Sequence, residues 1–224
     1  MLKNVTPEKA ISYTRFITVM SCCWPPPSAA TKSQELRFKI LRIALIINAS
    51  ALLLGLVYSI YLHHNDFINI AKAGSLSFAL IQVVVQTLFC ANQHDNLQVT
   101  SKLPEMSVFQ SYVDKFSTFY LLASTWFYLT LGVVVAGALL LPQPFPTNAE
   151  YPFSIDYEPI RSIIFVHQTL AGAQCVAHTC VNVFGALLIS FAAARIEILT
   201  TELRDVVDTA DLANCIKKYY RVKR

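Results

Sequence analysis

Four long runs of apolar residues divide the chain, and polar or charged residues separate each run from the next. The runs cover residues 43–62, 73–91, 118–141 and 162–194. A bilayer core of about 30 Å is crossed by roughly 20 apolar residues in helical form, and lipid forces such a run to satisfy its own backbone hydrogen bonds. We therefore expect an all-α membrane protein with four transmembrane helices.

The fourth run is longer than a bilayer requires. Its 33 residues would form a helix of about 50 Å. Beyond residue 194, Ile196, Leu199 and Leu203 keep a helical spacing of three and four among charged residues. The pattern predicts that the fourth helix leaves the membrane and continues into the cytosol as an amphipathic extension within residues 195–224.

Lysine and arginine are distributed unevenly among the connecting segments. Residues 1–42 and 195–224 contain seven each, and residues 92–117 contain two. The segments 63–72 and 142–161 contain one each. Because positive residues stay on the cytoplasmic side, this 16-to-2 distribution predicts a cytoplasmic N-terminus and C-terminus. The proline-rich segment 142–161 is then external, where its prolines disfavour helix.

The overall composition agrees with a membrane protein. Hydrophobic residues make up 54% of the 224 residues and charged residues only 14%, whereas soluble domains carry roughly 25% charged residues. None of the six cysteines falls in a segment expected outside the cell, so we expect all six to be reduced thiols.

The fourth apolar run carries polar residues at helical spacing. His167, Gln174, His178 and Asn182 are separated by seven, four and four residues, which places them on one helical face. One interpretation is interhelical hydrogen bonding, worth about 0.6 kcal/mol per bond in membranes. The other is that Gln174 and His178 line a ligand cavity, because polar groups inside a membrane are costly and often functional.

The second and third runs offer further residues for such a cavity. Aromatic side chains with a few polar groups suit a small apolar ligand, although aromatics at helical spacing also serve plain packing. The candidate ligand-binding residues are Ser75, Phe78, Gln82, Trp126, Thr130, Gln174 and His178.

No pattern in the sequence predicts catalysis. The chain lacks a phosphate-binding loop, a glycine-rich dinucleotide turn and the common hydrolase and metalloprotease motifs. His63 and His64 are adjacent and point in different directions on a helix, so a metal would need a ligand from elsewhere. We expect no enzymatic activity, no metal, no cofactor and no nucleic-acid partner.

Several short motifs are shared with a known receptor family. They are Tyr13-Thr14-Arg15-Phe16, Trp24-Pro25-Pro26, Leu141-Pro142, Tyr151-Pro152-Phe153, Pro159, His167-Gln168 and Ala194-Arg195-Ile196-Glu197-Ile198-Leu199. In these motifs and in its inside N-terminus, the chain resembles the insect odorant receptors, which have seven transmembrane helices and about twice this length. The resemblance implies a truncated N-terminal part with four of the seven spans.

The resemblance also implies a function. The chain would be an odorant receptor subunit that binds a small volatile organic ligand and acts with the odorant co-receptor in an odorant-gated cation channel. It would lie in the lipid bilayer of the plasma membrane, in the dendrites of olfactory sensory neurons. The family's pore-lining helix would be missing, and the odorant pocket would lack one wall.

A second interpretation stays open, in which four spans are the complete design of a tetraspan structural or adaptor protein. Such proteins usually carry cysteines in their external segments, and this chain has none there. A membrane-embedded enzyme would need paired carboxylates or a metal cluster, which the sequence does not provide.

Overall fold

The computed structural model describes residues 7–23, 31–92, 106–140, 145–155 and 157–204. All secondary structure in these residues is helical. The elements are α1 (Pro7–Ile17), the 3-10 helix η1 (Val19–Ser21), α2 (Lys32–Leu62), α3 (Phe67–Asn92), α5 (Met106–Leu140) and α6 (Ile160–Arg204). The chain divides into two compact units, 1–181 and 182–224, and α6 contributes residues to both.

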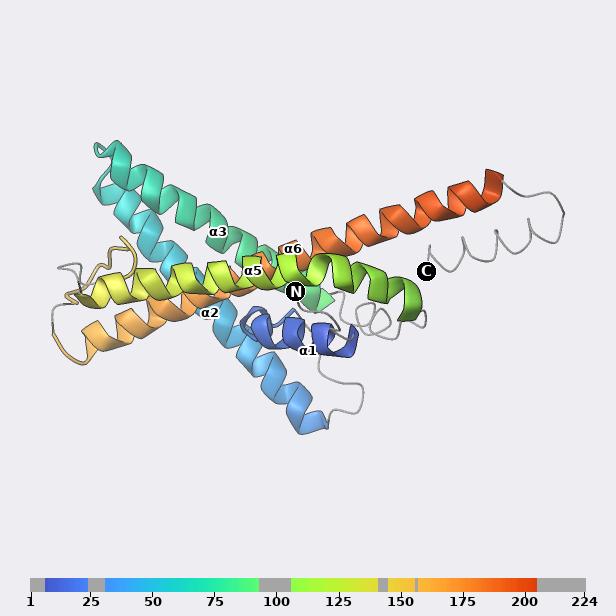
Figure 1. Ribbon diagram of the computed structural model, residues 1–224. Helices are drawn as coiled ribbons and strands as arrows, with labels where there is room; N and C mark the ends of the chain where they lie inside the picture. Colours follow the sequence, from blue (N-terminus) through green and yellow to red (C-terminus); the bar gives the residue numbers. More distant parts are fainter. Residues whose placement is uncertain (1–6, 24–30, 93–105, 141–144, 156, 205–224) are drawn as a thin grey trace. The chain divides into compact units, whose positions relative to one another are not determined.

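Helices α2 and α3 form an antiparallel hairpin (Figure 1). The α2 N-terminus is closed by a capping box, in which the Thr31 hydroxyl accepts from the Gln34 amide and the Gln34 side chain accepts from the Thr31 amide. This cap places the helix start eleven residues before Ile43, where the apolar run begins. Asp66 caps α3 by accepting from the amides of Ile68 and Asn69 at 3.0 and 3.2 Å.

The hairpin is held together by a narrow apolar seam. The buried residues recur every three or four positions on both helices, as expected for one face of a helix. They are Ala49, Leu52, Leu56, Ala73, Leu80 and Val83. Small residues such as Ala49 and Ala73 in this seam allow helix backbones to approach closely, which suits helix packing in lipid.

Helix α1 packs against α5 (Figure 1). The Tyr13 and Ser124 hydroxyls lie 2.9 Å apart, and the Tyr128 hydroxyl donates to the carbonyl of Ile17. The Tyr13 and Tyr120 rings meet edge to face at 6.4 Å. The N-terminal segment, expected only to be cytoplasmic, therefore contacts α5 within its apolar Thr118–Leu140 part.

Within the residues that the structure describes, three helices are long and apolar enough to cross a membrane: Lys32–Leu62, Phe67–Asn92 and the Thr118–Leu140 part of α5. They contain three of the four expected spans. Large apolar side chains cover their outer surfaces; Phe78, for example, is 77% exposed. Such a surface in a bundle is typical of a lipid-facing one.

Helix α6 contains the fourth expected span but is not among those three helices. Its polar residues, including Gln168, Gln174 and His178, make it less apolar, and these side chains are buried. The expected helical continuation past residue 194 is confirmed as far as Arg204, the last residue described. Residues 205–224 of the expected extension lie outside the described part of the chain.

Candidate functional site

Helix α6 presents one polar face to α2 and α3, as its spacing predicts. His167 and Gln174 contact Asn48 on α2, and His178 contacts Gln86 and Thr87 on α3. These bonds confirm that the polar face of α6 makes interhelical hydrogen bonds. Gln174 and His178 are each only 2% exposed, so every bond lost here would leave a polar group unpaired in an apolar interior.

The hydrogen bonds around Asn48 fix the orientation of each group in turn. The Gln174 Nε2 group donates to the carbonyl of Leu45 at 3.0 Å, which leaves Gln174 Oε1 as an acceptor. The Asn48 Nδ2 group donates to that oxygen at 3.1 Å. Asn48 Oδ1 is therefore turned toward His167 Nδ1, 2.8 Å away. Since Oδ1 can only accept, His167 Nδ1 carries the hydrogen.

These hydrogen bonds leave one lone pair of the His167 ring without a donor. A neutral imidazole carries a single hydrogen, and in His167 that hydrogen lies on Nδ1. The Nε2 atom is then an acceptor, and it is buried with no hydrogen-bond partner among the described residues. A buried acceptor without a donor costs about 1–3 kcal/mol, so His167 Nε2 is a ready position for a donor group from a ligand.

The α5–α6 loop, described over residues 145–155, folds back onto the helices. The Glu150 amide donates to the carbonyl of Gly55 on α2 at 3.1 Å, and the Thr147 amide donates to Gln168 Oε1 on α6 at 3.0 Å. Gly55 permits this approach, because a Cβ atom there would lie 3.2 Å from the Glu150 carbonyl oxygen. The loop is thus docked by its backbone.

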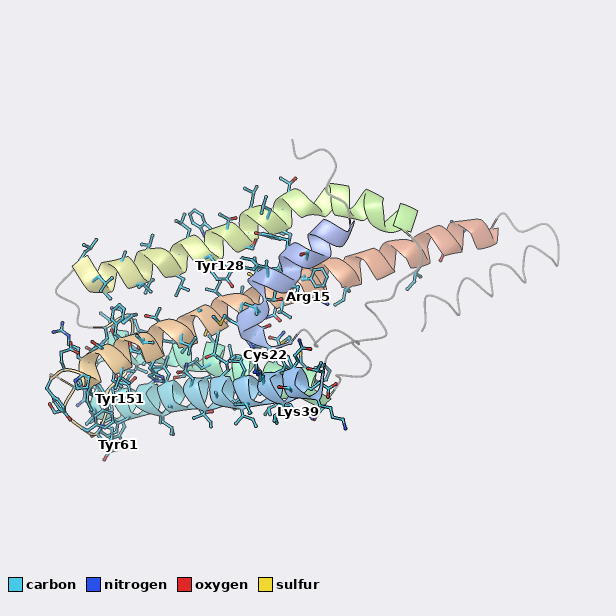
Figure 2. All side chains as sticks on the ribbon, turned by 90° about the horizontal axis from the view of Figure 1, so that it is seen from below. Arg15, Cys22, Lys39, Tyr61, Tyr128 and Tyr151 are labelled. Carbon is cyan, nitrogen blue, oxygen red and sulfur yellow. The ribbon has the colours of Figure 1, made fainter. Side chains whose placement is uncertain are left out.

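Tyr151 joins this loop to the His167 side of α6. Its hydroxyl accepts from Gln168 Nε2 at 3.3 Å, and its ring lies edge to face with the His167 ring at 6.4 Å. The Phe153 ring packs against Tyr151 at 5.5 Å. Burial raises the pKa of Tyr151, and the Gln168 bond partly offsets that effect. Figure 2 shows Tyr151 and Tyr61 at the same end of the helices.

A second polar cluster surrounds His178. Its Nε2 atom lies 3.1 Å from the Thr87 hydroxyl, and its Nδ1 atom lies 3.2 Å from Gln86 Oε1 and 3.9 Å from the Cys23 sulfur. The Thr87 hydroxyl already donates to the carbonyl of Val83 at 2.8 Å. A Thr87 hydroxyl that donates to Val83 calls for a hydrogen on Nε2, whereas Gln86 Oε1, which can only accept, calls for a hydrogen on Nδ1, so the two contacts favour different tautomers of a neutral ring.

The predicted ligand-binding residues fall into two groups. Gln174 and His178 lie in the two buried clusters. The other five, Ser75, Phe78, Gln82, Trp126 and Thr130, are exposed on the helix surfaces. The hydroxyls of Ser75 and Thr130 are bonded to backbone carbonyls of their own helices. Asn182, the last member of the predicted face, is also exposed.

Sequence reasoning missed Asn48 as a partner of this face. It is the only amide side chain in the apolar run 43–62. A single amide in such a run could have indicated a hydrogen-bond partner for the polar face of α6. Thr87 gave no signal, because a threonine can satisfy its hydroxyl within its own helix.

The cysteines and other metal-ligating residues complete the inventory of this region. The five described cysteines are free thiols, and Cys215 lies outside the described residues. No group of three histidine, cysteine or acidic side chains comes together in the part of the chain that the structure describes.

A scan against protein-family models, a search of curated proteins and a search of solved structures each found no match to this chain.

Proposed function

We propose that this chain is a membrane-embedded chemosensory receptor subunit that binds a small organic molecule carrying a hydroxyl group. The observation that carries the proposal is the buried acceptor His167 Nε2, which has no hydrogen-bond partner in the described part of the chain and lies beside the docked α5–α6 loop. The resemblance to insect odorant receptors supports it independently, because a volatile alcohol is small, apolar and has one donor.

The proposed site combines apolar contact with one directional bond. Tyr151 and Phe153 provide aromatic surface, and His167 Nε2 provides the acceptor. Because Nε2 is buried beneath surrounding atoms, the ligand enters when the α5–α6 loop separates from α6. The ligand then replaces the Tyr151 contact and supplies the missing hydrogen bond, so the bound state satisfies a group that the free state leaves unpaired.

The proposal includes a topology. α6 is a fourth transmembrane helix, because the buried side chains of Gln174 and His178 are hydrogen-bonded to α2 and α3 and need not meet lipid. The distribution of basic residues supports a cytoplasmic N-terminus and an external α5–α6 loop. A membrane-impermeant maleimide should label Ser154→Cys in intact cells and Ser12→Cys only after permeabilisation. Labelling of Ser12→Cys in intact cells would reverse the proposed orientation.

The binding test uses two isomers, 1-hexanol and methyl pentyl ether, with the full chain in lipid nanodiscs. Only the alcohol can donate to His167 Nε2. We expect a saturable rise of the thermal unfolding temperature with the alcohol. The hydrogen bond should make binding of the alcohol about tenfold tighter than binding of the ether.

Two matched variants test the role of the imidazole. His167→Phe should abolish the preference for the alcohol, whereas His63→Phe should keep it, because His63 Nδ1 lies 3.2 Å from the Ser59 carbonyl of its own helix. Equal stabilisation by both isomers in the unaltered chain would refute the hydroxyl specificity. Absence of saturable stabilisation by any volatile in a broad panel would refute ligand binding and favour the tetraspan adaptor alternative.

In a complete receptor, such a subunit would act in the plasma membrane together with a co-receptor subunit, as the family resemblance implies. Ligand binding changes a channel only if the ligand has different affinities for its closed and open states. The loop supplies such a difference, because the site is covered when the loop is docked. We expect no odorant-evoked current from this chain expressed alone.

A further inference from the structure

Three side chains from distant parts of the sequence meet in the polar cluster around His178. Cys23 follows η1, Gln86 lies on α3 and His178 lies on α6. The Cys23 sulfur and the Gln86 Oε1 atom lie 3.9 and 3.2 Å from the same ring nitrogen, His178 Nδ1. Cys23 is a buried free thiol, and His178 is buried as well. A sulfur, a nitrogen and an oxygen atom therefore converge at one position inside the bundle.

A single hydrogen on the His178 ring cannot suit both of its sides. The Thr87 hydroxyl donates to the carbonyl of Val83, so toward His178 Nε2, 3.1 Å away, it accepts. With the hydrogen on Nε2, the lone pair of Nδ1 faces the Gln86 oxygen, which is also an acceptor. A doubly protonated ring would suit both sides, but it would place an ionised group in an apolar interior, which is costly. A metal ion on Nδ1 removes the conflict, because it binds the lone pairs of nitrogen and oxygen together.

The distances suit an ion that contacts all three atoms. An ion about 2.3 Å from sulfur and about 2.0 Å from imidazole nitrogen fits the 3.9 Å between Cys23 and His178 at an S–metal–N angle of about 130°. An oxygen ligand at about 2.1 Å fits the 3.2 Å between Gln86 and His178 at an N–metal–O angle of about 100°. The ring hydrogen on Nε2 then points to Thr87, and such a bond commonly orients a metal-bound histidine.

The charge of the ligands selects the kind of ion. A thiolate and an imidazole are ligands for Zn(II) and for the softer ion Cu(I). In the part of the chain that the structure describes, no third histidine, cysteine or acidic side chain joins Cys23 and His178, so the thiolate supplies a single negative charge. Cu(I) with one thiolate is neutral. Zn(II) would leave one positive charge in an apolar interior, which is costly.

We infer that Cys23, His178 and Gln86 form a three-coordinate site for one Cu(I) ion. Binding breaks the S–H bond of Cys23 and forms an S–Cu bond, and the proton is released to water. Lone pairs of His178 Nδ1 and Gln86 Oε1 complete the coordination, and neither copper nor sulfur changes its oxidation state. The ion joins the segment after η1 to α3 and α6. This inference uses neither His167 nor the α5–α6 loop, so it can hold or fail independently of the proposed function.

The test measures transfer of Cu(I) to the full chain in lipid nanodiscs, in oxygen-free buffer. Cu(I) is supplied as its coloured complex with bicinchoninate, and the loss of colour reports the copper that the protein takes up. Any of the six cysteines could hold copper weakly, so the site is identified by X-ray absorption at the copper edge. We expect one tightly held copper per chain with one sulfur neighbour and the scattering of an imidazole ring. An excess of Zn(II) should not displace it.

Matched variants assign the ligands. Cys23→Ser and His178→Phe should each lose the tightly held copper, whereas Cys175→Ser should retain it. Thr87→Val keeps all three ligands and removes only the group that orients the ring, so it should weaken copper binding about ten- to hundredfold. No transfer to the unaltered chain, a spectrum without imidazole, displacement by zinc, or tight binding that survives in Cys23→Ser would each overturn the inference.

Discussion

The docking of the α5–α6 loop onto Gly55 gives a sharp prediction for one added side chain. A Cβ atom at Gly55 would lie 3.2 Å from the Glu150 carbonyl oxygen, 3.3 Å from Ala149 Cβ and 3.4 Å from the Tyr151 ring. The first two of these contacts are tighter than ordinary packing. We expect Gly55→Leu to push the loop off α2, because backbone atoms of the loop cannot rotate away.

The magnitude follows from the bond that is lost. The Glu150 amide donates to the Gly55 carbonyl at 3.1 Å, and such a bond contributes about 0.5–1.5 kcal/mol net. Loss of this free energy should speed amide hydrogen exchange at Glu150 about two- to tenfold. The Thr147 amide, bonded to Gln168 at 3.0 Å, should follow, because the loop docks as a unit.

The matched control is Gly74→Leu, since a Cβ atom at Gly74 meets nothing within 4 Å. It should leave exchange at Glu150 and Thr147 unchanged. Gly55→Ala distinguishes an effect on the loop from an effect on the helix, because alanine stabilises a helix relative to glycine by about 1 kcal/mol. The loop amides should therefore exchange faster while α2 amides exchange no faster. Unchanged loop exchange in Gly55→Leu, measured by mass spectrometry in nanodiscs, would refute the proposed docking.

Three further predictions test the other contacts. Asn48→Leu should lower the free energy of unfolding by about 1–2 kcal/mol, because several interhelical hydrogen bonds are lost. Gln82→Leu on the exposed surface should not lower it, and unfolding by detergent titration measures the free energy for both variants. Burial raises the pKa of Tyr151, so docking should be at full strength below pH 10 and weaken as the pH rises through the raised pKa. Subtilisin should cleave the loop faster as the pH rises through this raised pKa, and Tyr151→Phe should remove this pH dependence. A double-mutant cycle of Tyr13→Phe and Ser124→Ala should give a coupling of about 0.5–1.5 kcal/mol in thermal unfolding, and zero coupling would contradict the α1–α5 contact.

The helices were largely predictable from the sequence. Apolar runs of membrane length admit little besides helix, so the cores of α2, α3, α5 and α6 could be located from pattern alone. The ends could not, because they depend on local caps. The Thr31–Gln34 capping box extends α2 through a polar stretch that hydropathy excludes, and Asp66 sets the start of α3.

The polar face of α6 was only half predictable. Helical spacing placed His167, Gln174 and His178 on one side, because residues that are three, four or seven apart share a face. Spacing along one helix carries no information about the facing helix. That Asn48 orders His167 and Gln174, and that Gln86 and Thr87 both meet His178, depended on how the helices pack.

The sequence by itself determined the apolar spans, the uneven distribution of basic residues and the absence of catalytic motifs, because composition and periodicity are local properties of the chain. Only the tertiary structure decided which groups meet. It brought the α5–α6 loop onto Gly55, left His167 Nε2 without a donor among the described residues and placed the Cys23 sulfur 3.9 Å from His178 Nδ1. These contacts join residues tens of positions apart, and close approach of helices through small residues creates them.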